Sequence, residues 1–235
     1  MIIFWRFLLS HLLADFTLQF DVVNRLKRKS VYGMLLHCFT HLVVSVGLLY
    51  KYLGDVWMDF GFIKVNGWLA VILMLVFHFA VDEIRVYSMN KLGYKDGTIS
   101  FLLDQVAHVS VLFVISPVYP LDASFFLPEK WVGLVSIFVI ITHATTVLIY
   151  FIEKDLKQTR FPDFDEKYFL IFERVVLWAF FFVPGNWWIP FMLAWIFQIF
   201  YVKRKRIIDL SMTNISLSVI ITLLCGIWAR HIYYS

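Results

Sequence analysis

The chain has 235 residues, of which 61% are hydrophobic and 19% aromatic, and its mean hydropathy is +0.77. A soluble domain is about half apolar, so this composition excludes an ordinary soluble protein and predicts an all-α polytopic membrane protein. The net charge of +4 does not indicate nucleic-acid binding, because the basic residues are expected at helix ends. The two cysteines lie far apart within apolar runs, which argues against a disulfide framework.

Eight apolar runs follow one another along the chain and predict the membrane-spanning helices. The runs cover residues 2–20, 32–53, 66–86, 98–117, 131–152, 169–184, 187–202 and 207–229. The first run is as hydrophobic as a signal peptide but has no A-x-A-like cleavage site, and we interpret it as a retained span. The sixth and seventh runs are short and flank a Pro-Gly-Asn turn, so they form two spans or one re-entrant hairpin. We expect a transmembrane helical bundle of seven to eight spans.

The basic residues of the loops predict the orientation of these spans. Loops one, three, five and seven hold fifteen Lys and Arg residues, whereas the loops and ends on the opposite side hold five. Under the positive-inside rule, the basic loops face the cytoplasm and both termini face outward. The outward loops 51–65 and 118–130 are expected to contain short interfacial pieces. We divide the chain into a four-span half, residues 1–117, and a supporting transmembrane half, residues 118–235.

Four pairs of ionisable residues lie inside the first four runs, and the members of each pair are four residues apart. The pairs are His11/Asp15, His37/His41, His78/Asp82 and Asp104/His108. Residues four apart share one helix face, and charged groups in hydrocarbon are costly, so four pairs on four successive spans predict one shared site.

The depth of these residues sorts them into two layers. Counted at ~1.5 Å per residue from the cytoplasmic end of each span, four imidazoles lie ~12–15 Å deep and the other four groups ~6–9 Å deep. The deeper layer is His11, His41, His78 and His108, and the shallower layer is Asp15, His37, Asp82 and Asp104. The sequence therefore predicts a closed cluster in the cytoplasmic half of the membrane.

These residue types are those of a transition-metal site. Imidazole and carboxylate together suit Zn²⁺, Fe²⁺, Mn²⁺ or Co²⁺, and zinc is the ion we expect. The spacing leaves two arrangements open: a dinuclear centre that shares the eight groups, or one ion whose remaining carboxylates orient the imidazoles or act as a base. All eight residues are candidate metal ligands, and Asp15, Asp82 and Asp104 are the candidate catalytic carboxylates.

Other polar residues in the runs have structural interpretations. His143 lies at the depth of the imidazole layer but has no acidic partner four residues away, which favours a role in packing or in orienting a ligand residue. Gln105 points about 100° away from Asp104, and we expect it to bond an adjacent helix. Glu173 and Arg174 are expected to snorkel to the interface or to pair with a neighbour.

The motifs HLLADFTLQ (11–19), HCFTH (37–41), HFAVD (78–82) and DQVAH (104–108) resemble a bacterial family of membrane proteins known only as a domain of unknown function. The stretch FERVV (172–176) is similar to an acidic–basic step late in that domain. The resemblance covers residues 1–125 well and the remainder loosely. It implies a helical protein of the bacterial inner membrane and supports the four pairs as the site; the termini that the loop charges predict to face outward would then be periplasmic. The site is also similar in type to those of integral-membrane metal-dependent hydrolases. This similarity concerns the kind of site alone and is an analogy.

These features favour a membrane-embedded metal-dependent enzyme, namely a hydrolase that acts on a lipid or lipid-linked substrate from the cytoplasmic leaflet. The expected partners are membrane lipid and a lipid-like or small-molecule substrate, without nucleic acid. A divalent metal-cation transporter that uses HxxxD pairs is an alternative, although the apolar outer halves of the spans offer no exit path. A di-iron oxygen-using enzyme is a further alternative. A scaffold, in which the pairs only join helices, would tolerate their replacement.

Overall fold

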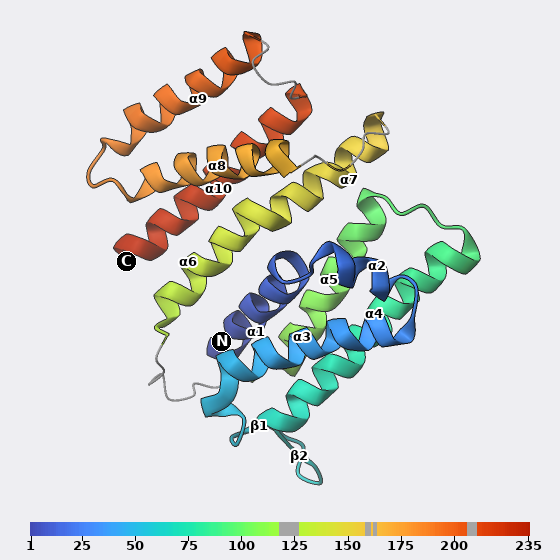
Figure 1. The fold of residues 1–235 in the computed structure, drawn as a ribbon. Coiled ribbons are helices and arrows are strands. Elements are labelled where there is room, and N and C mark those ends of the chain that lie inside the picture. Colours follow the sequence, from blue (N-terminus) through green and yellow to red (C-terminus); the bar gives the residue numbers. More distant parts are fainter. Residues whose placement is uncertain (118–126, 158–160, 162–163, 206–210) are drawn as a thin grey trace. The chain divides into compact units, whose positions relative to one another are not determined.

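The computed structural model describes residues 1–235 except 118–126, 158–160, 162–163 and 206–210, and its fold is all-α (Figure 1). The chain divides into two compact units, Met1–Val132 (unit 1) and Gly133–Ser235 (unit 2). Among the described residues, four helical segments are long and apolar enough to cross a membrane, and they indicate a membrane protein. These segments are Val31–Tyr52, Thr98–Ile115, Glu129–Lys157 and Met212–Tyr234.

Unit 1 contains a helix in each of the first four apolar runs. Its helical elements are α1 (Ile2–Leu12), η1 (Leu13–Thr17), α2 (Asp21–Lys27), α3 (Val31–Leu49), η2 (Tyr50–Tyr52), α4 (Gly67–Leu92) and α5 (Thr98–Ile115). Helix α3 begins after Ser30, whose side chain accepts a hydrogen bond from the N–H of Gly33, and α4 begins after Asn66, which accepts from Leu69. These are N-terminal caps. Helix α4 ends at Leu92 and is followed by Gly93, whose φ of 72° suits glycine.

Two local features position polar residues in unit 1. Helix α1 continues into the π-helical turn η1, which carries Asp15, and π-turns are frequent at functional sites. The short helix α2 packs against the start of α3 at Gly33, where a Cβ atom would lie 2.2 Å from the backbone carbon of Leu26. This close approach requires glycine, and it brings the end of α2, with Lys27, against α3.

An antiparallel hairpin links α3 to α4, in the loop where we expected short interfacial pieces. Its strands are β1 (Val56–Asp59) and β2 (Lys64–Asn66). Trp57 is fully buried, donates its indole N–H to the carbonyl oxygen of Tyr52 at 2.8 Å, and packs edge-on against Phe7. The hairpin and α2 adjoin opposite ends of α3 (Figure 1). The expected interfacial pieces of loop 118–130 lie mostly outside the described residues.

Unit 2 contains the remaining helices. They are α6 (Glu129–Val139, which starts in unit 1), η3 (Ile140–Ala144), α7 (Thr145–Lys157), α8 (Phe164–Ala179), η4 (Phe180–Phe182), α9 (Trp188–Arg204) and α10 (Met212–Tyr234). The predicted turn between the sixth and seventh runs separates α8 from α9, and Gly185 in this turn has a φ of 60°. Helix α10 approaches η4 at Gly226, where a Cβ atom would lie 2.3 Å from the ring of Phe181.

Candidate metal centre

The eight predicted site residues lie on four helical elements of unit 1. The α1–η1 element carries His11 and Asp15, α3 carries His37 and His41, α4 carries His78 and Asp82, and α5 carries Asp104 and His108. The five imidazoles are at most 3% exposed. Their rings pack together around His78, whose centroid lies 3.8 Å from that of His41 and 4.3 Å from that of His108. The fold therefore brings histidines from four helices into one buried cluster.

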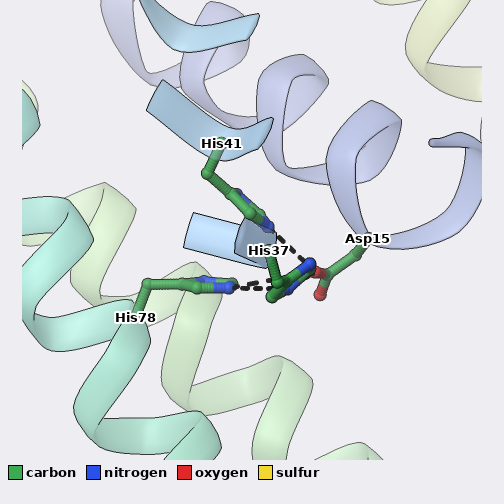
Figure 2. Close-up of side chains that lie close together, drawn as sticks. All are labelled: Asp15, His37, His41 and His78. Atoms are coloured by element: carbon green, nitrogen blue, oxygen red, sulfur yellow. Dashed lines mark hydrogen bonds and ion pairs between the residues drawn. The ribbon is translucent and has the colours of Figure 1, made fainter. Parts of the chain in front are cut away.

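The tightest group in this cluster comprises four residues from three helical elements, and their side chains converge (Figure 2). The group is Asp15, His37, His41 and His78. The Nε2 atoms of His37 and His41 each lie 3.0 Å from Oδ1 of Asp15. The Nε2 atom of His78 lies 3.1 Å from Nε2 of His37 and 3.9 Å from the same Oδ1. Ligands around a tetrahedral zinc ion lie about 3.3–3.6 Å apart, so these four side chains could hold one metal ion.

Two further groups share residues with the first. They are His11, Asp15 and His108, and then His78, Asp82 and His108. Within each group, one potential ligand atom of each residue lies within 4.8 Å of the others. Asp15, His78 and His108 each belong to two groups. The carboxylate of Asp15 could bridge two neighbouring ions, whereas each neutral imidazole has one lone pair and could bind only one of them. The geometry accommodates either one ion or two.

The hydrogen bonds of His108 show why the cluster suits a cation. Its Nδ1 atom lies 2.9 Å from the main-chain oxygen of Asp104, so Nδ1 must carry the proton and donate it. A neutral imidazole has one proton, and Nε2 therefore presents a lone pair. This Nε2 atom is buried and has no hydrogen-bond partner among the described residues. A metal-ligating histidine is held in this way, with its second nitrogen donating to a carbonyl or carboxylate.

The carboxylate of Asp104 lies outside the three groups. Its Oδ2 atom accepts hydrogen bonds from Arg85 at 3.0 Å and from Gln105 at 3.1 Å. Arg85 also donates to Asp96 at 3.0 Å. The structure thus places this candidate ligand in an ion pair, while its main-chain carbonyl orients His108.

The spacing pattern did not single out three polar side chains that the structure places beside the site. Lys27, at the end of α2, has its Nζ atom 2.7 Å from Oδ2 of Asp82. Gln105 bonds an adjacent helix, as expected, but its partner is Nε2 of His11 at 3.2 Å. In the sequence, Arg85 and Lys27 count only among the basic residues that orient the spans, and no sequence signal distinguishes them from the other basic residues near helix ends.

The site lies in the part of the chain that matches a known family. No curated protein and no solved structure matches the chain. A family model described as "Protein of unknown function (DUF3307)" matches residues 3–133, which coincide with unit 1 and include all eight predicted site residues. This match confirms the resemblance to a family of unknown function. Because it covers more than half of the sequence, the chain belongs to the DUF3307 family.

Proposed function

We propose that the protein is a metal-dependent hydrolase, embedded in the bacterial inner membrane, that acts on a lipid or lipid-linked substrate. The observation that carries this proposal is the buried convergence of five imidazoles and Asp15, together with Nε2 of His108, which has no hydrogen-bond partner among the residues that the structure describes. Zinc is the proposed ion, as one or two ions, because imidazole and carboxylate at this separation suit it.

The orientation of the chain is part of the same proposal. Seven to eight spans with both termini in the periplasm would put the site in the cytoplasmic half of the membrane. A substrate would then reach it from the cytoplasmic leaflet. Labelling of Lys29→Cys and Gly61→Cys, which lie before and after α3, would test this orientation. The first cysteine should react from the cytoplasmic side of the membrane and the second from the periplasmic side.

Three side chains have proposed roles in the reaction. A bound zinc ion would supply a water whose pKa is close to ~7. Asp15 would hold the ion together with His37 and His41, whose Nε2 atoms each lie 3.0 Å from its Oδ1 atom. Asp82 would accept a proton from that water, because its Oδ2 atom lies 3.3 Å from Nε2 of His78, one of the proposed ligands. Lys27, which pairs with that carboxylate at 2.7 Å, would offer its charge to an anionic group of the substrate.

Elemental analysis of the gently extracted full chain tests the metal directly. We expect at least one zinc ion per chain, and the absence of any stoichiometric transition metal would reject the proposal. Incubation with a radiolabelled membrane lipid extract then tests hydrolysis, with release of labelled head group or acyl chain as the readout. Iron recovered under anaerobic conditions would favour the di-iron oxygen-using variant.

A divalent-cation transporter is the second candidate. The group of Asp15, His37, His41 and His78 has the four ligands that a transport site requires. The adjoining His11, Asp82 and His108 are more than one transported ion needs, and this surplus favours an enzyme. Zinc or manganese flux into vesicles that contain the purified chain would support transport, whereas bound metal without flux supports the enzyme.

A further inference from the structure

The short helix α2 connects two helices of unit 1, and one of its faces is not covered by the protein. It ends at Lys27, shortly before α3 begins, and the segment Val31–Tyr52 that contains α3 is long and apolar enough to cross a membrane. The polar head groups of a bilayer lie directly outside its hydrocarbon core. A helix that adjoins the end of a span is therefore at the level of the head groups, and lipid can contact its uncovered face.

The opposite face of α2 is held against the rest of unit 1. Its residues Val23, Asn24 and Lys27 are half-buried, and Lys27 pairs with Asp82 at 2.7 Å. The backbone at the end of α2 approaches α3 so closely that a Cβ atom at Gly33 would lie 2.2 Å from it. These contacts determine which side of α2 faces the protein and which side faces away.

The uncovered side combines apolar and basic residues, and we call it the outer face of α2. Val22 is 56% exposed and Leu26 40% exposed. Arg25 and Lys29 are exposed as well. Residues three or four apart share one helix face, so these four residues lie on one side of the helix and its C-terminal extension. Phe20, just before α2, adds a ring that is 66% exposed.

The two basic residues of the outer face are available to a partner. In the described part of the chain neither Arg25 nor Lys29 forms an ion pair, whereas the neighbouring Arg28 pairs with Asp96 at 3.2 Å. Cations beside exposed apolar side chains are typical of helices that lie on an anionic lipid surface. At head-group level the membrane itself supplies both phosphate groups for the cations and an apolar layer for the hydrophobic side chains.

We propose that the outer face of α2 binds a membrane surface that contains anionic lipid. Val22 and Leu26 lie below the head groups, and Arg25 and Lys29 bind lipid phosphates. Lys27, on the other face, stays in contact with Asp82, so α2 separates the head-group layer from the histidine cluster. This contact depends neither on a bound metal nor on a reaction, and it therefore does not rest on the proposed hydrolase.

The surroundings of residue 22 in vesicles of defined composition test this proposal. Val22→Cys, in a full chain that also carries Cys38→Ala and Cys225→Ala, is labelled with the fluorophore NBD and reconstituted. One set of vesicles is phosphatidylcholine alone and the other contains an equal part of phosphatidylglycerol; the uncharged quencher acrylamide measures exposure to water. A basic residue at an anionic surface favours binding about fivefold. We expect quenching about fivefold weaker in the anionic vesicles, and this difference should be lost at about 1 M salt.

Two double variants of the labelled chain separate the outer face from the general basic charge of the protein. Arg25→Gln with Lys29→Gln should make quenching equal in the two sets of vesicles. Lys91→Gln with Lys205→Gln removes the same charge from exposed positions at the ends of α4 and α9, and it should leave the difference intact. Circular dichroism checks that all of these chains are folded.

A further variant tests the apolar part of the contact. Leu26→Ser keeps both basic residues and should strengthen quenching in the anionic vesicles. Equal quenching of the unchanged outer face in the two sets of vesicles, or an equal loss of the difference in both double variants, would overturn the proposal. A difference that depends on the number of chains per vesicle would assign the outer face to a second copy of the chain and would reject lipid as its partner.

Discussion

Buried polar side chains are arranged differently in the two units. In the histidine cluster of unit 1 they face one another, and imidazoles from four helices meet the carboxylates of Asp15 and Asp82. In unit 2 many face the backbone of their own helix. The hydroxyl groups of Thr142, Thr145 and Thr146 each donate at 2.7 Å to a main-chain oxygen four or five residues earlier. Such bonds satisfy a hydroxyl without any partner helix.

This difference separates polar residues that pack from polar residues that form a site. The Nε2 atoms of His11, His37, His41 and His78 each contact a side chain of another helical element, and an ion held by the cluster, as proposed, would bind through such nitrogens. His143 of unit 2 is the matched contrast, because its Nδ1 atom lies 3.1 Å from the hydroxyl of the adjacent Thr142, and it belongs to none of the ligand groups among the described residues. This placement agrees with its expected packing role.

The largest effect is expected for His78→Ala, because His78 belongs to two ligand groups and lies at the centre of the ring cluster. Loss of residues that only orient a ligand lowers metal affinity about 10- to 100-fold, so loss of this ligand should exceed about 100-fold. Zinc titration of the purified variant against a competing chelator measures the change.

The control for that measurement is His143→Ala, which removes an imidazole from unit 2. It should leave zinc stoichiometry and affinity as in the unchanged chain. Hydrogen exchange adds a second test: chelation should lower protection in residues 1–132 and leave residues 133–235 unaffected. An equal loss of zinc in both variants would mean that the histidine cluster of unit 1 is not the metal site.

The next largest effect is expected for Arg85→Met, which breaks an ion pair with the buried carboxylate of Asp104. Removing one partner of a buried pair costs about 3–5 kcal/mol. Arg174→Met should cost less, about 1–3 kcal/mol, because its partners are neutral and remain so. Unfolding of the reconstituted variants measures both changes, and Asp104→Asn should recover part of the stability of Arg85→Met. Equal losses for the two arginines would contradict this assignment of charge pairing.

Residue spacing could predict the cluster because a period of four fixes the helix face that each pair shares. It could not predict that the carboxylate of Asp104 lies outside the ligand groups, because Asp104 has the same four-residue spacing from its histidine as the other aspartates have. Its carboxylate is engaged by Arg85 of α4, and this contact depends on the register between two helices. Lys27 escaped notice for a related reason, since α2 reaches the site through a close contact at Gly33.

The fold was predictable to a similar degree. Each apolar run contains a helix, because hydrophobic length is a strong signal. The hairpin after α3 was not expected, because its strands are only four and three residues long and its turn has no Asn-Gly or Asp-Gly pair. Its stability comes instead from the burial of Trp57, which is a tertiary contact.

Substitution of one glycine in each unit tests how that unit tolerates an added methyl group. Gly33→Ala would put a Cβ atom 2.2 Å from the backbone of Leu26, and Gly226→Ala would put one 2.3 Å from the ring of Phe181. Overpacking of this kind costs about 1–3 kcal/mol. A side chain can be exchanged and a backbone cannot, so Phe181→Leu should restore the stability of Gly226→Ala, whereas Leu26→Ala should not restore Gly33→Ala. Thermal unfolding of the four variants measures this, and rescue by Leu26→Ala would show that α2 does not lie against α3.

The smallest effect is expected for Lys27→Met, and it has the opposite sign to the loss of a ligand. The Nζ atom of Lys27 lies 2.7 Å from Oδ2 of Asp82, and that oxygen lies 3.3 Å from Nε2 of His78, so the positive charge of Lys27 would repel a metal ion held by the imidazoles. Removing the charge should tighten zinc binding about tenfold. The corresponding free energy, about 1.4 kcal/mol, is a modest share of the Coulomb energy between two unit charges at this distance. Lys29→Met, at an exposed position just after α2, is the matched control and should leave the affinity unchanged. Weaker binding in Lys27→Met would mean that this lysine supports the ion and does not repel it.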